Sequence, residues 1–189
     1  MIFDLVMKSR SYRRFDQTFQ ISEGTLIELV KLARLSPTAS NLQPLKFLIA
    51  CNSQMNNKIF STLGWAGYLK DWGGPIESER PTGYIIILGD KKIKEIFGVD
   101  YGIAAQTMML GAVEKGLGGC MITTIKREAL MNSLNINEQY EILMILALGK
   151  PVEEVVITAI PESGDIRYYR SKLGIHHVPK RSLEDLIVK

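Results

Sequence analysis

Cysteine and histidine are scarce in this sequence, which argues against the sites that depend on them. The only such residues are Cys51, Cys120, His176 and His177. No Cys-x-x-Cys pair is present, and two adjacent histidines point to opposite faces of an extended chain, so neither pattern predicts a metal site. Each cysteine lies in an apolar run, and this placement favours buried, reduced thiols over a disulfide.

Strong net charge and long apolar runs are lacking as well. The formal net charge is +3, which is too small by itself to predict a nucleic-acid partner. No run is long and apolar enough to cross a bilayer, and Asp4 interrupts the start of the chain, where a signal peptide would be apolar. We therefore expect a cytoplasmic protein that binds neither membranes nor nucleic acids.

The familiar catalytic motifs are missing too. Gly116-x-Gly118 would need a third glycine at position 121 to form a dinucleotide-binding turn, but Met121 stands there. Lys150 is followed by Pro151, where a P-loop needs Ser or Thr. There is no G-x-S-x-G elbow and no paired set of carboxylates. The sequence therefore predicts no catalytic side chain.

Hydrophobic residues make up 46% of the chain and are arranged in alternating helical and extended patterns. Helical patterns are found at 2–9, after Ser22, and at 53–63, 101–115 and 126–134, and strand patterns at 47–51, 82–88, 120–122, 142–148 and 155–159. Ser22, Ser53 and Asp100 are candidate helix caps, and Ser182 to Asp185 has the spacing of a helix start. The pattern predicts one α+β or mixed α/β domain spanning 1–189.

Residues 36–44 form a small polar segment between a helix pattern and a strand pattern, which we call the proline-flanked loop. Pro37 ends the preceding helix and Pro44 favours an extended entry into the next strand. Thr38, Ala39 and Asn41 lie between them. The loop is either an ordinary turn or a rigid wall for a flat ligand with polar edges.

Residues 64–75, which we call the aromatic loop, contain Trp65, Tyr68, Trp72 and four glycines. This composition favours either a mobile cover over a pocket or a small satellite cluster. From residue 162 the chain is polar, aromatic and basic. We expect this tail, 162–189, to wrap around a partner subunit.

Two basic clusters stand near the ends of the chain. Arg10, Ser11 and Arg13 offer two guanidinium groups and a hydroxyl within four residues, and Lys180 and Arg181 offer a second pair. Such donors suit a phosphate monoester, which accepts bidentate, charge-assisted hydrogen bonds. A solvated basic face is the alternative reading.

Four segments in this order resemble the FMN-dependent nitroreductase family. They are Arg10-Ser11-x-Arg13-x-Phe15, the segment 32–44 with its P-[ST]-[AS]-x-N-x-Q-P ending, 116–119, and 178–184. The resemblance spans positions 10 to 184. It implies a mostly antiparallel central sheet flanked by helices, and a homodimer that binds FMN at its interface.

The resemblance also implies roles for individual residues. Arg10, Ser11 and Arg13 would hold the FMN phosphate and the polar edge of the flavin, with Lys180 and Arg181 completing the phosphate pocket. The remaining flavin-site residues would be Pro37, Thr38, Ala39 and Asn41 from the other subunit and Met121, Ile122, Thr123 and Thr124 along the ring. Two positions depart from the family pattern, because Ser9 and Leu45 replace a common arginine and a common tryptophan.

The chemistry implied by the resemblance takes place at flavin N5. NAD(P)H would reduce the flavin and leave, and a nitroaromatic or quinone would then be reduced in a ping-pong cycle. Trp65, Tyr68 and Trp72 would lie on the substrate side. The alternatives are a flavin-storage module with little turnover, a dehalogenase or dehydrogenase of the same family, and a small basic adaptor without flavin.

Overall fold

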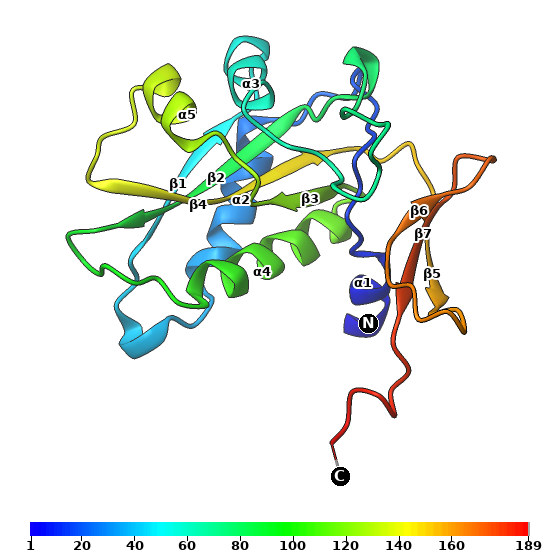
Figure 1. Cartoon of the computed structure of the whole chain (residues 1–189). Coiled ribbons are helices and arrows are strands. Elements are labelled where there is room, and N and C mark those ends of the chain that lie inside the picture. The colour runs from blue at the N-terminus through cyan, green and yellow to red at the C-terminus, as the bar shows by residue number, and fades with distance from the viewer. Residues whose placement is uncertain (189) are drawn as a thin grey trace.

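A four-stranded antiparallel sheet forms the centre of the molecule in the computed structural model, which describes residues 1–188 (Figure 1). Its strands, in spatial order, are β1 (Leu45–Ala50), β2 (Gly83–Asp90), β4 (Tyr140–Gly149) and β3 (Gly118–Ile122). The two central strands, β2 and β4, are almost entirely buried, because their Ile- and Leu-rich sequences supply apolar side chains to both faces. This confirms the antiparallel sheet predicted above.

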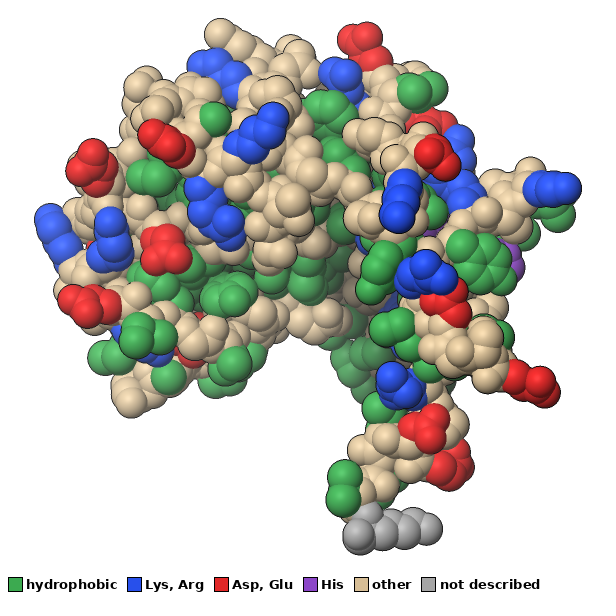
Figure 2. Space-filling model, in the orientation of Figure 1, with side chains coloured by type: hydrophobic (Ala, Val, Ile, Leu, Met, Phe, Trp, Pro, Cys, Tyr) green, Lys and Arg blue, Asp and Glu red, His purple; other side chains and the backbone are tan. Residues whose placement is uncertain are grey.

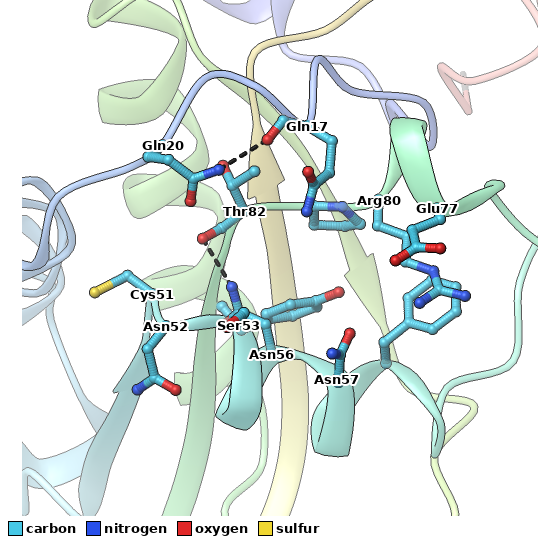
Figure 3. A pocket seen from close by; sticks show the side chains of 13 residues that line it. Gln17, Gln20, Cys51, Asn52, Ser53, Asn56, Asn57, Glu77, Arg80 and Thr82 are labelled. Atoms are coloured by element: carbon cyan, nitrogen blue, oxygen red, sulfur yellow. Dashed lines mark hydrogen bonds between the residues drawn. The ribbon is translucent and has the colours of Figure 1, made fainter.

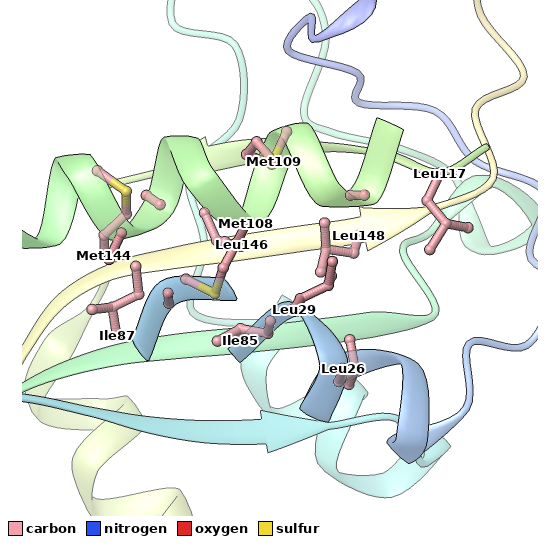
Figure 4. Close-up of a cluster of buried hydrophobic side chains, with 14 of the residues drawn as sticks. Leu26, Leu29, Ile85, Ile87, Met108, Met109, Leu117, Met144, Leu146 and Leu148 are labelled. Atoms are coloured by element: carbon pink, nitrogen blue, oxygen red, sulfur yellow. The ribbon is translucent and has the colours of Figure 1, made fainter. Parts of the chain in front are cut away.

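Helices cover both faces of this sheet. The helices are α2 (Glu23–Arg34) and α4 (Asp100–Glu114) on one face, and α3 (Ser53–Phe60) and α5 (Arg127–Leu134) on the other. Alternate residues of a strand point to opposite faces, so Ile85 and Ile87 pack with α2 and α4 (Figure 4), whereas Ile86 and Leu88 pack with α3 and α5. No helix within residues 1–188 is long and apolar enough to cross a membrane.

Several predicted helix ends are confirmed and others are wrong. The Ser22 hydroxyl accepts a hydrogen bond from the Thr25 amide at 3.1 Å and caps α2 as predicted. Asn52, rather than Ser53, caps α3, because its side chain lies one position earlier and accepts from the Met55 amide at 2.9 Å. α3 also ends at Phe60 instead of continuing to position 63.

Two more predictions about helix starts are wrong. Asp100 is the first residue within α4, and Val99 occupies the capping position. The carboxylate of Asp100 bonds elsewhere, to the proline-flanked loop. At Ser182 the hydroxyl accepts from the Asp185 amide at 3.2 Å, but only a turn forms there, because no apolar face of this segment packs against the domain.

A second, smaller sheet lies beside the short helix α1 (Ile2–Lys8) (Figure 1). It contains β5 (Val155–Ala159), β7 (His176–Lys180) and β6 (Tyr169–Arg170), with β5 and β7 parallel. Only β5 was predicted, because β6 and β7 lack apolar alternation. Within this predicted tail, β7 pairs with β5 and β6 pairs with β7 of the same chain, whereas residues 181–188 extend away from the domain (Figures 1 and 2).

Both ends of the described chain expose apolar side chains. Helix α1 has no buried residue, and Phe3 is 71% exposed. The tail exposes Leu183, Leu186 and Ile187 in the same way. The chain by itself therefore leaves apolar surface uncovered at both ends, which monomeric proteins seldom do to this extent.

Candidate functional site

The segment 10–15, which we call the arginine segment, runs along the outer edge of the central sheet. The Tyr12 amide donates to the Gly119 carbonyl at 2.9 Å, and Ser11 forms a β-bridge with the same glycine. A Cβ atom at Gly118 would lie 2.5 Å from the ring of Tyr12. Glycine at 118 therefore lets the arginine segment approach β3 closely, which is a structural role.

A buried carboxylate that the sequence did not single out holds the arginine segment in place. Glu153 accepts hydrogen bonds from the backbone amides of Arg13 and Arg14, and its other oxygen lies 3.1 Å from Arg170 in an ion pair. Its side chain is only 1% exposed. Buried charges in proteins are normally paired in this way, so Glu153 both neutralises Arg170 and fixes the path of the segment.

The guanidinium group of Arg13 lies among three groups. Its Nη1 is 3.3 Å from His176 Nε2 and 3.2 Å from the Ser11 carbonyl, and it sits 4.9 Å from the centre of the Tyr168 ring. Because arginine only donates, Nε2 of His176 is the acceptor and its proton is on Nδ1. Burial, with the Arg13 and Arg170 charges nearby, lowers the pKa of His176 to about 4. The imidazole is therefore neutral near pH 7.

Arg10 retains a donor for a ligand. Its Nη2 donates to the Val6 carbonyl at 2.6 Å, but its Nε is buried and has no hydrogen-bond partner among residues 1–188. A buried, unpaired donor of a cation is costly unless an anion or water meets it. Arg10 therefore fits the phosphate-binding role that the resemblance implies.

Lys180 and Arg181 lie at the far end of β7 and are exposed. In the described part of the chain, no hydrogen bond or ion pair links them to Arg10, Ser11 or Arg13. Strand β7 starts beside Arg13 at His176, so Lys180 stands about 13 Å farther along it. The structure thus connects the two basic clusters through β7 without bringing them into contact.

The first part of β3 lies against the arginine segment. Cys120 follows Gly119 in β3, and burial raises the pKa of its thiol. Met121 and Ile122 follow Cys120 in β3, and the exposed Thr123 and Thr124 come directly after the strand. These four residues, predicted to follow the flavin ring, therefore continue along β3 and beyond it from the point where the arginine segment meets the strand at Gly119.

The aromatic loop packs against the same group of side chains. The Tyr68 ring lies 4.9 Å from the Tyr168 ring, whose hydroxyl accepts from the Tyr68 amide at 3.3 Å. Arg170 lies over Trp72 at 4.8 Å. Trp65 instead packs 5.7 Å from Phe60 in the core beneath α3. Tyr68 and Trp72 thus border the site, and Trp65 supports the loop from below.

The proline-flanked loop lies at the other end of α4. The Ala39 amide donates to the Asp100 carboxylate at 3.0 Å, and the Gln43 amide donates to the Thr38 hydroxyl at 3.1 Å. Ala39 thus lies at the start of α4, and the fifteen residues of this helix put about 22 Å between its start and the end that leads into β3 (Figure 1). Ser36, at the beginning of the loop, lies about halfway along α4, where its hydroxyl donates to that of Thr107 at 3.0 Å. Within one chain, Pro37, Thr38, Ala39 and Asn41 are therefore not brought together with Arg13.

Sequence reasoning missed Glu153, Tyr168 and His176. In the sequence these residues belong to an acidic pair after Pro151, a Tyr-Tyr-Arg run and a pair of histidines. None of these patterns matches the spacing of a known motif. The described residues contain no cluster of His, Cys, Asp or Glu that could hold a metal ion. The site consists of cationic and hydroxyl donors with aromatic rings, which suits an anionic organic cofactor with an aromatic ring system and agrees with FMN.

Comparison with known proteins agrees with this site and fold. A family profile described as "Nitroreductase family" matches residues 6–64 and 79–150, more than half of the chain. The 4-nitrobenzoate reductase of Pseudomonas putida is 24% identical, over 84% of this chain and 89% of that protein. The iodotyrosine deiodinase of Thermotoga neapolitana is 25% identical, over 80% of this chain and 89% of that protein. A solved FMN-dependent nitroreductase from Clostridium difficile has a TM-score of 0.65 and 23% identity, over 82% of this chain and 89% of that chain.

Proposed function

The chain belongs to the nitroreductase family of FMN-dependent oxidoreductases, and we propose that it reduces flat, electron-poor acceptors such as nitroaromatics or quinones with NAD(P)H. FMN, when bound, supplies the redox chemistry, because its ring accepts hydride at N5 and passes it on. The protein supplies binding, orientation and exclusion of water. The single observation that carries this proposal is that the arginine segment lies against β3 at Gly119 and reaches the aromatic loop through Tyr168, which contacts both Arg13 and Tyr68.

Each group in the site has a role in this proposal. Arg10, with its unpaired Nε, and Ser11 bind the phosphate, and Arg13 donates to the polar edge of the flavin. Neutral His176 accepts from Arg13 and holds the guanidinium group in position without adding a competing charge. Tyr68 and Trp72 then border the space in which the acceptor lies.

We further propose that the working unit is a homodimer with two shared sites. Ala39 of the proline-flanked loop lies at the start of α4, and about 22 Å of helix separates it from the end that leads into β3 and the arginine segment, so a site that uses both takes them from two chains. The uncovered apolar side chains of α1 and of the tail supply surface for such an interface. In the same dimer, Lys180 and Arg181 would complete the phosphate pocket, and the tail would wrap around the partner subunit.

Removal of the two arginines tests the cofactor site. Purified protein should be yellow, and Arg10→Ala/Arg13→Ala should lower FMN affinity at least about 100-fold, because two charge-assisted hydrogen-bonding groups are lost. Flavin fluorescence titration measures this. The matched control is Lys31→Ala/Arg34→Ala, which removes two exposed basic residues of α2. Unchanged FMN affinity in the first variant would refute the assignment.

Rapid mixing with NADH and NADPH tests the turnover. Fast loss of the flavin colour, followed by its return on addition of a nitroaromatic or quinone, is expected. A yellow protein that barely oxidises either nucleotide would instead be a flavin-storage module.

A second candidate function rests on the iodotyrosine deiodinase relative, which is as similar as the reductases. In this case the acceptor would be a halogenated aromatic. Release of halide from a halotyrosine, at a rate above the reduction of a nitroaromatic, would favour the dehalogenase.

A further inference from the structure

One face of the β6 segment contacts both the arginine segment and the aromatic loop. Tyr168 precedes β6 and Arg170 lies within it, and residues two positions apart in an extended chain point to the same face. The Arg13 guanidinium lies 4.9 Å from the centre of the Tyr168 ring, and the Arg170 guanidinium lies 4.8 Å from the centre of the Trp72 ring. These two side chains therefore connect the arginine segment to the loop that borders the site.

The domain itself fixes both ends of the aromatic loop. At its start, the Gly64 amide donates to the Thr124 carbonyl at 2.9 Å. A few residues after the loop, the Arg80 guanidinium lies 4.2 Å from the centre of the Phe60 ring, and Figure 3 shows the Arg80 side chain close to α3. The same Phe60 ring lies 5.7 Å from Trp65. The two ends of the loop therefore have fixed positions.

The middle of the loop, residues 66–73, depends on the β6 segment instead. A Cβ atom added at Gly67 or Gly73 would meet no atom within 4 Å apart from its chain neighbours, so these positions stand clear of the domain. Every hydrogen bond and ring contact between 66–73 and the rest of the described chain goes to Tyr168 or Arg170. Segments with few contacts open easily, so these two residues decide where the middle of the loop lies.

Arg170 has a fixed position of its own. Its guanidinium is 3.1 Å from the buried Glu153 carboxylate, and its side chain is only 18% exposed. A planar guanidinium can pair with a carboxylate at its edge while its face lies over an indole. Because Glu153 also accepts from the Arg13 amide, one carboxylate positions both the predicted flavin donor and the support of Trp72.

We propose that Tyr168 and Arg170 are positioning residues for the acceptor, because they hold Tyr68 and Trp72 in the wall of the acceptor space. This inference rests on the proposed function, in which these two rings border that space. Tyr168 and Arg170 act through the loop, so loss of their contacts with it weakens acceptor binding and leaves the phosphate donors unchanged. FMN affinity thus depends on the arginine segment, whereas acceptor affinity depends on the β6 segment.

Hydrogen exchange followed by mass spectrometry tests the support of the loop without any turnover. Arg170→Lys keeps a positive charge beside its carboxylate partner but removes the flat group over Trp72, and Tyr168→Phe removes only the acceptor of the Tyr68 amide. Each should speed exchange over 64–75 at least about threefold in the protein with FMN bound. Unchanged exchange in both variants would overturn the proposal, whether or not the protein reduces any acceptor.

The matched controls lie in the same part of the chain. Arg167→Lys makes the same change at an exposed arginine that pairs with Asp165, and Tyr169→Phe changes the tyrosine that stacks on His177. Both should leave exchange of the aromatic loop unchanged. Equally fast exchange in these controls would show a general loosening of the small sheet and would overturn the assignment to the two positioning residues.

Binding of nitrobenzene and of menadione to the oxidised protein with FMN bound tests the consequence for the acceptor. The change in the visible flavin spectrum measures this without NAD(P)H, so a failure of turnover does not affect the result. Arg170→Lys should raise the dissociation constant of a bound probe about fivefold and should change FMN affinity less than about twofold. An unchanged probe affinity, or binding of neither probe to the parent protein, would overturn the proposal, and reduction of the flavin by NAD(P)H is tested separately.

A double-mutant cycle shows whether Arg170 acts through Trp72. Trp72→Leu removes the ring that Arg170 supports, so it should weaken probe binding by itself. Adding Arg170→Lys should then have no further effect, because the contact that it breaks is already absent. Thermal denaturation checks that all variants are folded. Additive losses of probe affinity would show that Arg170 acts by another route and would overturn the proposal.

Discussion

His176 is the single residue whose protonation has the largest consequence for the site. It accepts a hydrogen bond from Arg13 only while it is neutral, and its ring is also 5.2 Å from Tyr168. Protonation would place a third positive charge beside Arg13 and Arg170. The position of Arg13 therefore depends on keeping this imidazole uncharged.

This environment predicts a pH dependence of stability. Burial and the adjacent arginines lower the pKa of His176 to about 4 in the folded chain, whereas in the unfolded chain this pKa has its ordinary value of 6.5. Between these two pH values the unfolded chain therefore binds a proton at His176 that the folded chain does not bind. The free energy of unfolding should therefore fall as the pH drops from 6.5 to about 4. Between about pH 7 and about pH 5 this residue should contribute a loss of about 2 kcal/mol.

Urea unfolding of His176→Gln at the two pH values measures this contribution. The variant keeps an acceptor for Arg13 but cannot titrate, so its loss of stability on acidification should be smaller by that amount. His177→Gln, one residue along β7, should retain the full loss. An equal pH dependence in His176→Gln and in the parent protein would contradict the prediction.

Among the elements, the proline-flanked loop carries the most backbone strain. Ser40, Asn41 and Gln43 all have positive φ angles, near +50°, which side chains other than glycine seldom adopt. Such conformations persist only where the surroundings hold them, and here the Asp100 carboxylate accepts from the Ala39 amide. Asp100 is 2% exposed and lies 3.6 Å from Lys94. It is therefore a positioning residue for the loop.

Replacement of Asp100 should loosen this element. Asp100→Ala removes the acceptor of the Ala39 amide, so hydrogen exchange over residues 36–44 should become about tenfold faster or more. Exchange followed by mass spectrometry measures this. Asp100→Asn keeps an acceptor oxygen and should have a smaller effect, and Glu95→Ala, an exposed acid before α4, should have none. Unchanged exchange in Asp100→Ala would show that the loop holds its conformation unaided.

At the scale of the whole molecule, the central question is whether one chain or two complete the flavin site. The arginine segment and the proline-flanked loop lie at opposite ends of α4, and both ends of the chain expose apolar residues. In the homodimer proposed above, each loop would lie beside the arginine segment of the other chain. It would also cover α1.

A mixing experiment distinguishes the two arrangements. One variant carries Arg10→Ala/Arg13→Ala and the other carries Asp100→Ala/Thr38→Ala, so that each damages one half of the site. If the halves come from different chains, a mixed dimer contains one intact site, and random mixing should restore about a quarter of the FMN sites. FMN fluorescence after refolding the variants together measures this.

The controls are each variant refolded alone, which should bind little FMN. Light scattering should give the mass of a dimer throughout. No recovery of FMN binding on mixing would show that each site is complete within one chain, and it would contradict the proposed sharing of the site between two chains.

Local sequence was enough to predict the central domain and its family. Helical and strand periodicities placed α2, α4, α5 and all four central strands, because each depends on side chains that are close in sequence. The arginine segment was recognisable for the same reason. Its donors lie within four residues, and the spacing needs no knowledge of the fold.

Tertiary structure decided the rest, because the deciding contacts join residues that are distant in sequence. His176 and Glu153 meet Arg13 from 163 and 140 positions away. The partners of β6 and β7 are strands of a sheet that their own polar sequences do not predict. Periodicity reports burial, but it does not report which distant groups share a site.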